Sequence, residues 1–286
     1  MTTINTAIVV GGGIAGPVAA LALRRAGIAA TVYEAYPRST DGLGGTLALA
    51  PNGVAALGVV GADRAVTAAA TPISRQVLSI GDRRIPLPGL ADVPPLQVVA
   101  RHDLYRVLQD RCAAEGVAVE HGRRLVDVHD DGDGVTARFA DGSTVRADVL
   151  LGADGTGSVV RTLIDPDAPG PRYTGTMGFE GVARHEVDVE PGTMTFAFGR
   201  RGYYLYWPEP GGGTRWGVNL PQDRPSTIAE TRAIPAARWR ETLLAAYGDD
   251  DPGRELIATT PPEGLQTAGS LQIMPPVPHW HHTLPP

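Results

Sequence analysis

Hydrophobic positions at the start of the chain occur in an order that predicts a strand, a helix and a second strand. Ile4–Val10 is mostly apolar, as in a strand buried within a parallel sheet. Small residues then recur at helical spacing over Ala15–Ala26, and Gly27 is suited to end that helix. Ala29–Glu34 follows as a second apolar run. Together these segments predict a β-α-β unit.

The next part of the chain mixes helical and strand-like patterns. Ala55–Ala70 and the segment after Arg101 have helical periodicity. The segment between them is rich in proline, which suits edge strands and connections, so we expect an excursion into a second domain. Its strand-like runs are Val77–Ile80, Ile85–Leu87 and Leu96–Ala100.

Alternating patterns dominate the rest of the chain. Four short runs around Asp-Gly turns predict an antiparallel meander. They are Val117–Glu120, Leu125–His129, Val135–Ala140 and Thr144–Ala147. Three later runs, rich in aromatic and β-branched residues, predict a second sheet. They are Thr193–Phe198, Gly202–Trp207 and Thr214–Leu220.

The turn between the first strand and helix has the spacing G-x-G-x-x-G. Gly11 allows a sharp turn, Gly13 leaves room for a pyrophosphate, and Gly16 lets the helix lie close to the strand. The helix N-terminus favours phosphate through its free N–H groups and its dipole. Glu34 ends the next strand, where a carboxylate can accept hydrogen bonds from a ribose diol. The unit therefore predicts a dinucleotide site.

Two further strand-to-helix junctions carry polar side chains. Arg101 directly follows an apolar strand and precedes a helix, a place suited to phosphate or ribose contact. Asp154 stands in a glycine-rich turn after the buried run Asp148–Gly152. There its side chain can face a polyol or a pyrophosphate.

The composition narrows the chemistry. The 286 residues carry a net charge of −6, which gives no basic footprint for nucleic acid or an anionic membrane. The chain has no lysine, which excludes a P-loop and a Schiff-base lysine. Its one cysteine, Cys112, shares a helical face with Leu104 and Leu108, so we expect a buried thiol. No run approaches the roughly 20 apolar residues of a membrane span, and we expect a cytoplasmic protein.

Taken together, these residues resemble the single-component FAD-dependent monooxygenases of the aromatic-hydroxylase type, which share the p-hydroxybenzoate hydroxylase fold. The resemblance is strong from the start of the chain to about Thr174. It is carried by the first glycine motif with Glu34, by Gly44-Gly45 and Pro51-Asn52-Gly53, by Arg101, and by Gly152-Ala153-Asp154-Gly155 with Ser158 and Arg161.

The resemblance implies an α/β fold in which a Rossmann-like FAD/NAD(P)-binding domain is interleaved with a mixed-sheet substrate domain. The implied segments of the FAD-binding domain are 1–71 and 98–177, with a truncated return over 275–286. Those of the substrate domain are 72–97 and 178–274.

The resemblance also implies the cofactors and their contacts. The residues expected to bind FAD are Gly11, Gly13, Ile14, Ala15, Gly16, Glu34, Gly45, Arg101, Val126 and Asp154. In the family NAD(P)H reduces the flavin, and oxygen then forms a flavin C4a-hydroperoxide that hydroxylates or epoxidises a small aromatic or polycyclic molecule. A small-molecule substrate is the expected partner, without nucleic acid or membrane.

The aromatic residues of the second sheet are candidates for substrate contact. Alternation puts Tyr203 and Trp207 on one face of their strand and Tyr204 and Tyr206 on the other. One row can line a pocket for a planar substrate while the other fills the core. We single out Tyr204, Tyr206 and Trp216 as substrate candidates. No residue stands out as a general base, so catalytic residues stay unassigned.

The end of the chain departs from the family pattern. The resemblance implies a second aspartate motif of the type Gly-Asp-Ala-Ala-His, but the chain stops at Thr283–Pro286. Three readings stay open: an incomplete chain, a half completed by a second polypeptide, or a protein that binds a nucleotide or ligand without turnover. His279, His281 and His282 have no cysteine or carboxylate beside them, so we expect solvated side chains and no metal.

Overall fold

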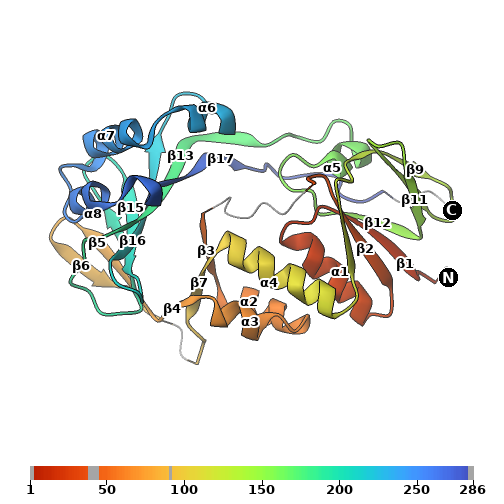
Figure 1. Ribbon diagram of the computed structural model, residues 1–286, viewed down its shortest axis with the longest axis horizontal. Helices are drawn as coiled ribbons and strands as arrows, with labels where there is room; N and C mark the ends of the chain where they lie inside the picture. Colours follow the sequence, from red (N-terminus) through yellow and green to blue (C-terminus); the bar gives the residue numbers. More distant parts are fainter. Residues whose placement is uncertain (1–2, 38–44, 90–91, 283–286) are drawn as a thin grey trace.

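The computed structural model describes residues 3–37, 45–89 and 92–282. Two parts lie side by side along the long axis of the molecule (Figure 1). One contains a four-stranded parallel sheet with helices, and the other contains a seven-stranded mixed sheet. The α/β architecture expected from the sequence is confirmed.

The parallel sheet is built around the predicted β-α-β unit. Strands β1 (Thr6–Val10) and β2 (Ala29–Glu34) pair in parallel and are joined by helix α1 (Ala15–Arg25). The outer strands β12 (Val149–Gly152) and β8 (Ala118–His121) complete the order β12-β1-β2-β8. Since β1 has one neighbour from early and one from late in the chain, the strand order reverses beside it.

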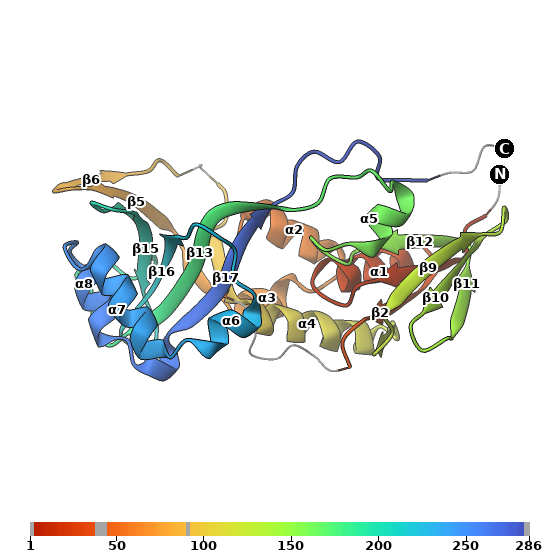
Figure 2. The ribbon, with the colours of Figure 1, turned by 90° about the horizontal axis from the view of Figure 1, so that it is seen from above.

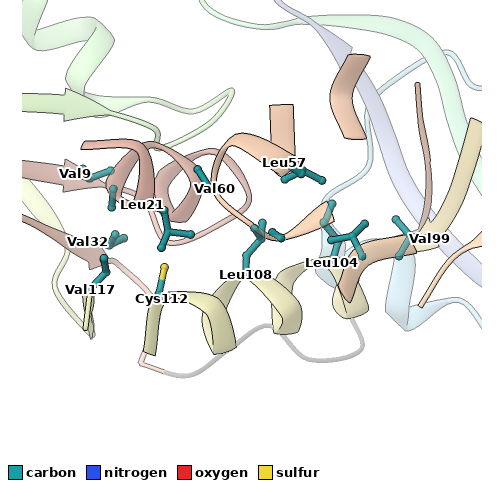
Figure 3. Packing of buried hydrophobic residues seen from close by; sticks show 13 residues of the cluster. Val9, Leu21, Val32, Leu57, Val60, Val99, Leu104, Leu108, Cys112 and Val117 are labelled. Carbon is teal, nitrogen blue, oxygen red and sulfur yellow. The ribbon is translucent and has the colours of Figure 1, made fainter. Parts of the chain in front are cut away.

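Helix α4 (Arg101–Ala114) covers this sheet and packs against α1. Its residues Leu104, Leu108 and Cys112 join Val9, Leu21 and Val32 in one buried cluster (Figure 3). The predicted helix over Ala55–Ala70 is two helices, α2 (Pro51–Val59) and α3 (Asp63–Ala68). They separate at Gly61, whose φ of +71° ends the first helix.

The Cys112 thiol is fully buried, and burial raises its pKa to about 11. Its Sγ lies 3.9 Å from the Pro17 carbonyl oxygen, which ties α4 to the start of α1. Because the thiolate is the reactive form, we expect native Cys112 to react with a disulfide reagent at pH 8 on the order of 100 times more slowly than in denaturant. A stopped-flow comparison measures this ratio, and equal rates would contradict the packing described.

The predicted four-stranded meander is wrong in one strand. Val117–Glu120 corresponds to β8, which pairs in parallel with β2. Its position follows from helix α4, because a helical crossover returns the chain to the same end of the sheet. The separate antiparallel sheet consists of β9 (Leu125–Asp130), β10 (Val135–Phe139) and β11 (Thr144–Ala147).

A small three-stranded sheet connects the two parts of the molecule. It has the order β3 (Thr46–Leu49), β7 (Leu96–Ala100), β4 (Thr71–Ile73). Ile73 and Val98 from this sheet pack against Met194 and Trp207 of the large sheet. The chain therefore crosses between the two parts through strands as well as loops.

The large sheet carries two long strands at one edge. Strand β13 (Arg172–Ala183) runs beside the edge strand β17 (Gln266–Ile273), as Figure 2 shows. The remaining order is β16 (Thr214–Pro221), β15 (Tyr203–Pro208), β14 (Thr193–Phe198), β5 (Arg75–Ile80) and β6 (Arg83–Pro86). Strand β13 continues through the predicted boundary between residues 177 and 178.

The two faces of the large sheet have different neighbours. Leu205 and Trp207 face the three-stranded sheet, whereas Tyr204 and Tyr206 lie beneath helices. Those helices are α7 (Ala236–Tyr247) and α8 (Gly253–Thr259). The shorter helical elements are α5 (Val159–Ile164), α6 (Ile228–Ala233) and the 3-10 turn η1 (Pro262–Gly264). None of the described helices has the length and apolarity to cross a bilayer.

Candidate functional site

A cleft of about 730 Å³ opens at the carboxyl ends of β1, β2 and β12. Its lining comes from the turn after β1, the end of β2, the turn after β12 and the start of α4. This is the place where the strand order reverses, which is where open α/β sheets bind ligands.

The glycines of the first turn have separable physical roles. Gly11 has a φ of +105°, and a Cβ there would lie 2.5 Å from the Ala153 carbonyl oxygen. A Cβ on Gly16 would collide with the Gly11 carbonyl. These two positions are therefore glycine for the sake of the fold.

Gly13 is different, because neither its backbone nor a neighbouring atom requires glycine. A Cβ built there meets nothing within 4 Å, and its φ is not positive. Gly157, in the opposite turn, has the same two properties, and both residues line the cleft. The open space in front of Gly13 fits a ligand that approaches the backbone closely.

Helix α1 points its N-terminus at this space. No side chain caps the helix, and its first turn contains no acidic residue. The cleft lining includes Ile14 and Ala15 at this end. From the other side, the Gln109 side chain of α4 donates a hydrogen bond to the Gly12 carbonyl oxygen at 3.1 Å. The turn is therefore held from outside, while its N–H groups stay available for an anion.

The Glu34 carboxylate lies across the first turn. Its Oε2 accepts a hydrogen bond from the Gly12 N–H at 2.6 Å, and its Oε1 accepts one from the Tyr36 N–H at 2.9 Å. Each carboxylate oxygen has a second lone pair. Glu34 is thus fixed in position and can still accept hydrogen bonds from a diol in the cleft.

Asp154 lines the cleft, but its carboxylate is occupied by its own turn. Oδ1 accepts a hydrogen bond from the Ser158 hydroxyl at 2.5 Å, and Oδ2 accepts from the N–H groups of Val159 and Val160 at 2.7 and 3.1 Å. The side chain therefore shapes the turn before α5, and the neighbouring Gly155 and Thr156 form the cleft surface.

Of the other predicted cofactor contacts that the structure describes, Arg101 lines the cleft, whereas Gly45 and Val126 do not. Arg101 lines the cleft, and its N–H donates to the Gly45 carbonyl oxygen at 3.1 Å. Gly45 is outside the lining, next to the Glu180 carboxylate of β13. Val126 is 38% exposed and also outside it, although its neighbour Leu125 is part of the wall. Gly44 lies outside the described residues.

Sequence reasoning missed an exposed aromatic platform at the mouth of the cleft. Tyr36 is 56% exposed, and the guanidinium carbon of Arg124 lies 5.6 Å from its ring centroid. Both residues line the cleft near Glu34. The signal available in the sequence was an aromatic residue two places after the strand-ending carboxylate, but only the fold brings Arg124 to it.

The three substrate candidates lie on the face of the large sheet that is covered by α7 and α8. Tyr204 donates a hydrogen bond to the Asp251 carbonyl oxygen at 3.1 Å, and the buried Trp216 indole donates to the Thr260 hydroxyl at 2.8 Å. Burial raises the pKa of Tyr204, which keeps its phenol neutral. Tyr206 also lines a cavity that is separate from the cleft.

The three C-terminal histidines are exposed. Within the described ranges, no three His, Cys, Asp or Glu side chains come together around a point where a metal ion fits.

Comparison with known proteins gives the family. Residues 4–237 match the family model described as "FAD binding domain". The chain belongs to this family. The predicted resemblance to FAD-dependent hydroxylases is confirmed, as is FAD as the cofactor of the fold.

Relatives and solved structures agree with the family. The chain is 33% identical over 257 residues to the 3-amino-4-hydroxybenzoate 2-monooxygenase of Streptomyces cremeus, covering 82% of this chain and 62% of the relative. It is 28% identical over 277 residues to the FAD-dependent urate hydroxylase of Klebsiella pneumoniae, covering 93% and 69%. The crystal structure of Klebsiella pneumoniae HpxO with FAD and uric acid superposes with a TM-score of 0.79 at 26% identity, covering 95% and 69%.

The residues of the cleft fit the adenosine diphosphate half of FAD. The open cradle at Gly13 and the uncapped end of α1 suit a pyrophosphate, and the fixed Glu34 carboxylate suits a ribose diol. Arg101 adds a guanidinium at the same opening. This donor set suits a dinucleotide.

Proposed function

We propose that this chain acts in an FAD-dependent monooxygenase that hydroxylates or epoxidises a small aromatic, heteroaromatic or polycyclic molecule. The observation that carries the proposal is the Gly13 cradle at the uncapped start of α1, with Glu34 fixed beside it. The named activities of the relatives support the reaction class.

The residues have distinct roles in this proposal. The N–H groups at Gly13, Ile14 and Ala15 hold the pyrophosphate, and Glu34 holds the ribose. Arg101 contributes positive charge to the phosphates. The adenine lies between the backbone near Val126 and the Tyr36–Arg124 platform, which offers a flat surface for stacking.

When bound, FAD supplies the redox chemistry, because it accepts a hydride from NAD(P)H and activates oxygen. The protein supplies position and a dry surface. The face of the large sheet that points toward the cofactor part carries Phe196, Leu205 and Trp207. Trp207 is covered by Ile73 and Val98, so a planar substrate packs against the half-buried Phe196 and Leu205, which exclude water from the reacting atoms.

Replacing Glu34 by glutamine should weaken FAD binding about tenfold. Both carboxylate oxygens accept hydrogen bonds from backbone N–H groups, so one of these donors would face the amide NH₂ group of glutamine. Flavin fluorescence titration measures the dissociation constant. Glu241→Gln, on the exposed face of α7, is the matched control and should bind FAD as the unaltered chain does. Equal affinities for the two variants would contradict the role of Glu34.

Turnover is tested with FAD-loaded protein in an oxygen electrode, supplied with NADH or NADPH and a panel of phenols, aminohydroxybenzoates and urate. We expect one class of compound to stimulate oxygen uptake and to yield a product that carries one atom of ¹⁸O from ¹⁸O₂. Protein that holds FAD but transfers no oxygen to any of these compounds would instead favour ligand binding without turnover.

A further inference from the structure

A second cavity, of about 920 Å³, lies in the large sheet part of the molecule. Its walls are the β5–β6 hairpin, strand β14, the segment 185–190 and the Asp251-Pro252 turn. Strand alternation shows which side of the sheet it occupies. Met194 and Phe196 of β14 pack toward the cofactor part, so Thr193 and Thr195 point the other way, into this cavity. The cavity is therefore on the far side of the sheet from the FAD cleft.

The floor of the cavity contains an unpartnered hydroxyl. Thr195 has none of its surface exposed, and its Oγ1 has no hydrogen-bond partner among the described residues. Thr193, two residues earlier, differs because its hydroxyl accepts a hydrogen bond from Arg75 Nε at 3.2 Å. The cross-strand partner of Thr195 is Tyr206, which also lines the cavity. A buried hydroxyl without a partner is unfavourable, and a polar group of a guest molecule would satisfy it.

The walls and rim determine what kind of guest fits. Val77, Leu87 and Val187 supply apolar wall. The carboxylates of the lining are Glu186, Asp188, Glu190 and Asp251, against the guanidinium groups of Arg75 and Arg84. Glu190 is paired with Arg75 at 2.5 Å, which leaves three carboxylates against one guanidinium and the imidazole of His185. This balance disfavours an anionic guest and favours an amine.

We propose that this cavity is a second ligand site, which binds a small aromatic amine that also carries a hydroxyl group. The hydroxyl reaches the floor at Thr195 and Tyr206, the ring packs along the apolar wall, and the ammonium group stays at the carboxylate rim. Because the sheet separates this site from the FAD cleft, the guest is bound and not oxidised there. The inference stands apart from the proposed function, since it uses no residue of the cofactor site.

Three matched probes test the proposal: tyramine, phenethylamine, which lacks the hydroxyl, and 4-hydroxyphenylacetate, which replaces the amine by a carboxylate. Isothermal titration calorimetry should show saturable one-to-one binding of tyramine. Each of the other two probes should bind about tenfold more weakly, or not measurably, because each loses one of the two polar contacts. Absence of saturable tyramine binding, or equal binding of 4-hydroxyphenylacetate, would overturn the proposal.

Thr195→Val is the decisive variant. Valine keeps the shape of threonine and removes the unpartnered hydroxyl, so the melting temperature should stay the same or rise. Tyramine should bind about tenfold more weakly to this variant, while phenethylamine binds as it does to the unaltered chain. Unchanged tyramine affinity in the folded variant would refute the site. Leu87→Trp, which fills the cavity from its exposed wall, should also remove tyramine binding.

Variants of the two sites distinguish a failure of this proposal from a failure of FAD binding. A variant of the glycine turn, Gly13→Val, should lose FAD and keep tyramine, whereas Thr195→Val should bind tyramine about tenfold more weakly and keep FAD. If both variants lost both ligands, the two sites would not be independent and the proposal would fail.

Discussion

Replacing Gly13 by valine should remove tight FAD binding and leave the fold intact. A Cβ at this position meets no protein atom within 4 Å, so a side chain there projects into the space proposed for the pyrophosphate. The phosphates would then lose the close approach to the N-terminus of α1. We expect the dissociation constant for FAD to rise on the order of 100-fold, a loss of about 3 kcal/mol in binding free energy. Flavin fluorescence titration measures it, and circular dichroism checks the fold.

Gly170→Val is the matched control for this experiment. Gly170 also has open space where a Cβ would stand and no positive φ, but it is outside the cleft. Both variants should melt near the temperature of the unaltered chain, and only Gly13→Val should lose FAD. If Gly13→Val bound FAD normally, the pyrophosphate would not lie at this turn.

Gly11→Ala, in contrast to Gly13→Val, should strongly lower the stability of the fold. The φ of +105° is unfavourable for alanine, and its Cβ would lie 2.5 Å from the Ala153 carbonyl oxygen. Backbone strain of this kind costs about 1–3 kcal/mol, and the contact between β1 and the turn after β12 adds to it. We expect the free energy of unfolding to fall by about 3 kcal/mol or more, measured by urea titration.

The control for Gly11→Ala is Gly142→Ala. Gly142 also has a positive φ, of +85°, but a Cβ there meets nothing within 4 Å. This variant carries backbone strain without the collision, so it should lose only about 1 kcal/mol. Equal losses in the two variants would mean that the packing of Gly11 against Ala153 contributes nothing.

The first unit of the fold was predictable because its signals are local. Strand β2 has the predicted bounds, and β1 and α1 differ from prediction only at their ends, since apolar periodicity and Gly27 lie within the segments themselves. The pairing of β8 was not predictable in the same way. The run Val117–Glu120 stands directly before the other short runs of the predicted meander, and only the crossover through α4 places β8 beside β2.

The large sheet was only partly predictable. Strands β14, β15 and β16 are dense in aromatic and β-branched residues, and their alternation set the two faces correctly. Strand β13 carries three glycines in Arg172–Ala183, which weaken any strand pattern. Its twelve residues are held as a strand by β16 and β17 on either side, and this information lies far away in the sequence.

The candidate site was also predictable only where its sequence signals are local. The spacing from Gly11 to Gly16 and the place of Glu34 follow from one β-α-β unit, so the sequence alone predicts their neighbourhood. The hydrogen bond from Gln109 to the glycine turn depends on the packing of α4 against α1, and no local pattern records it. The hydrogen bonds of Asp154 within its own turn are local, and its contact with the cofactor stays a prediction, because Asp154 also lines the cleft.

The measurement that tests the central claim most directly is competition between FAD and ADP for the purified chain. We propose that the glycine turn, Glu34 and Arg101 hold the adenosine diphosphate half of the cofactor. FAD should therefore bind with a one-to-one stoichiometry, ADP should displace it competitively, and riboflavin should not. Failure to bind FAD, or FAD binding that saturating ADP leaves unchanged, would contradict the account.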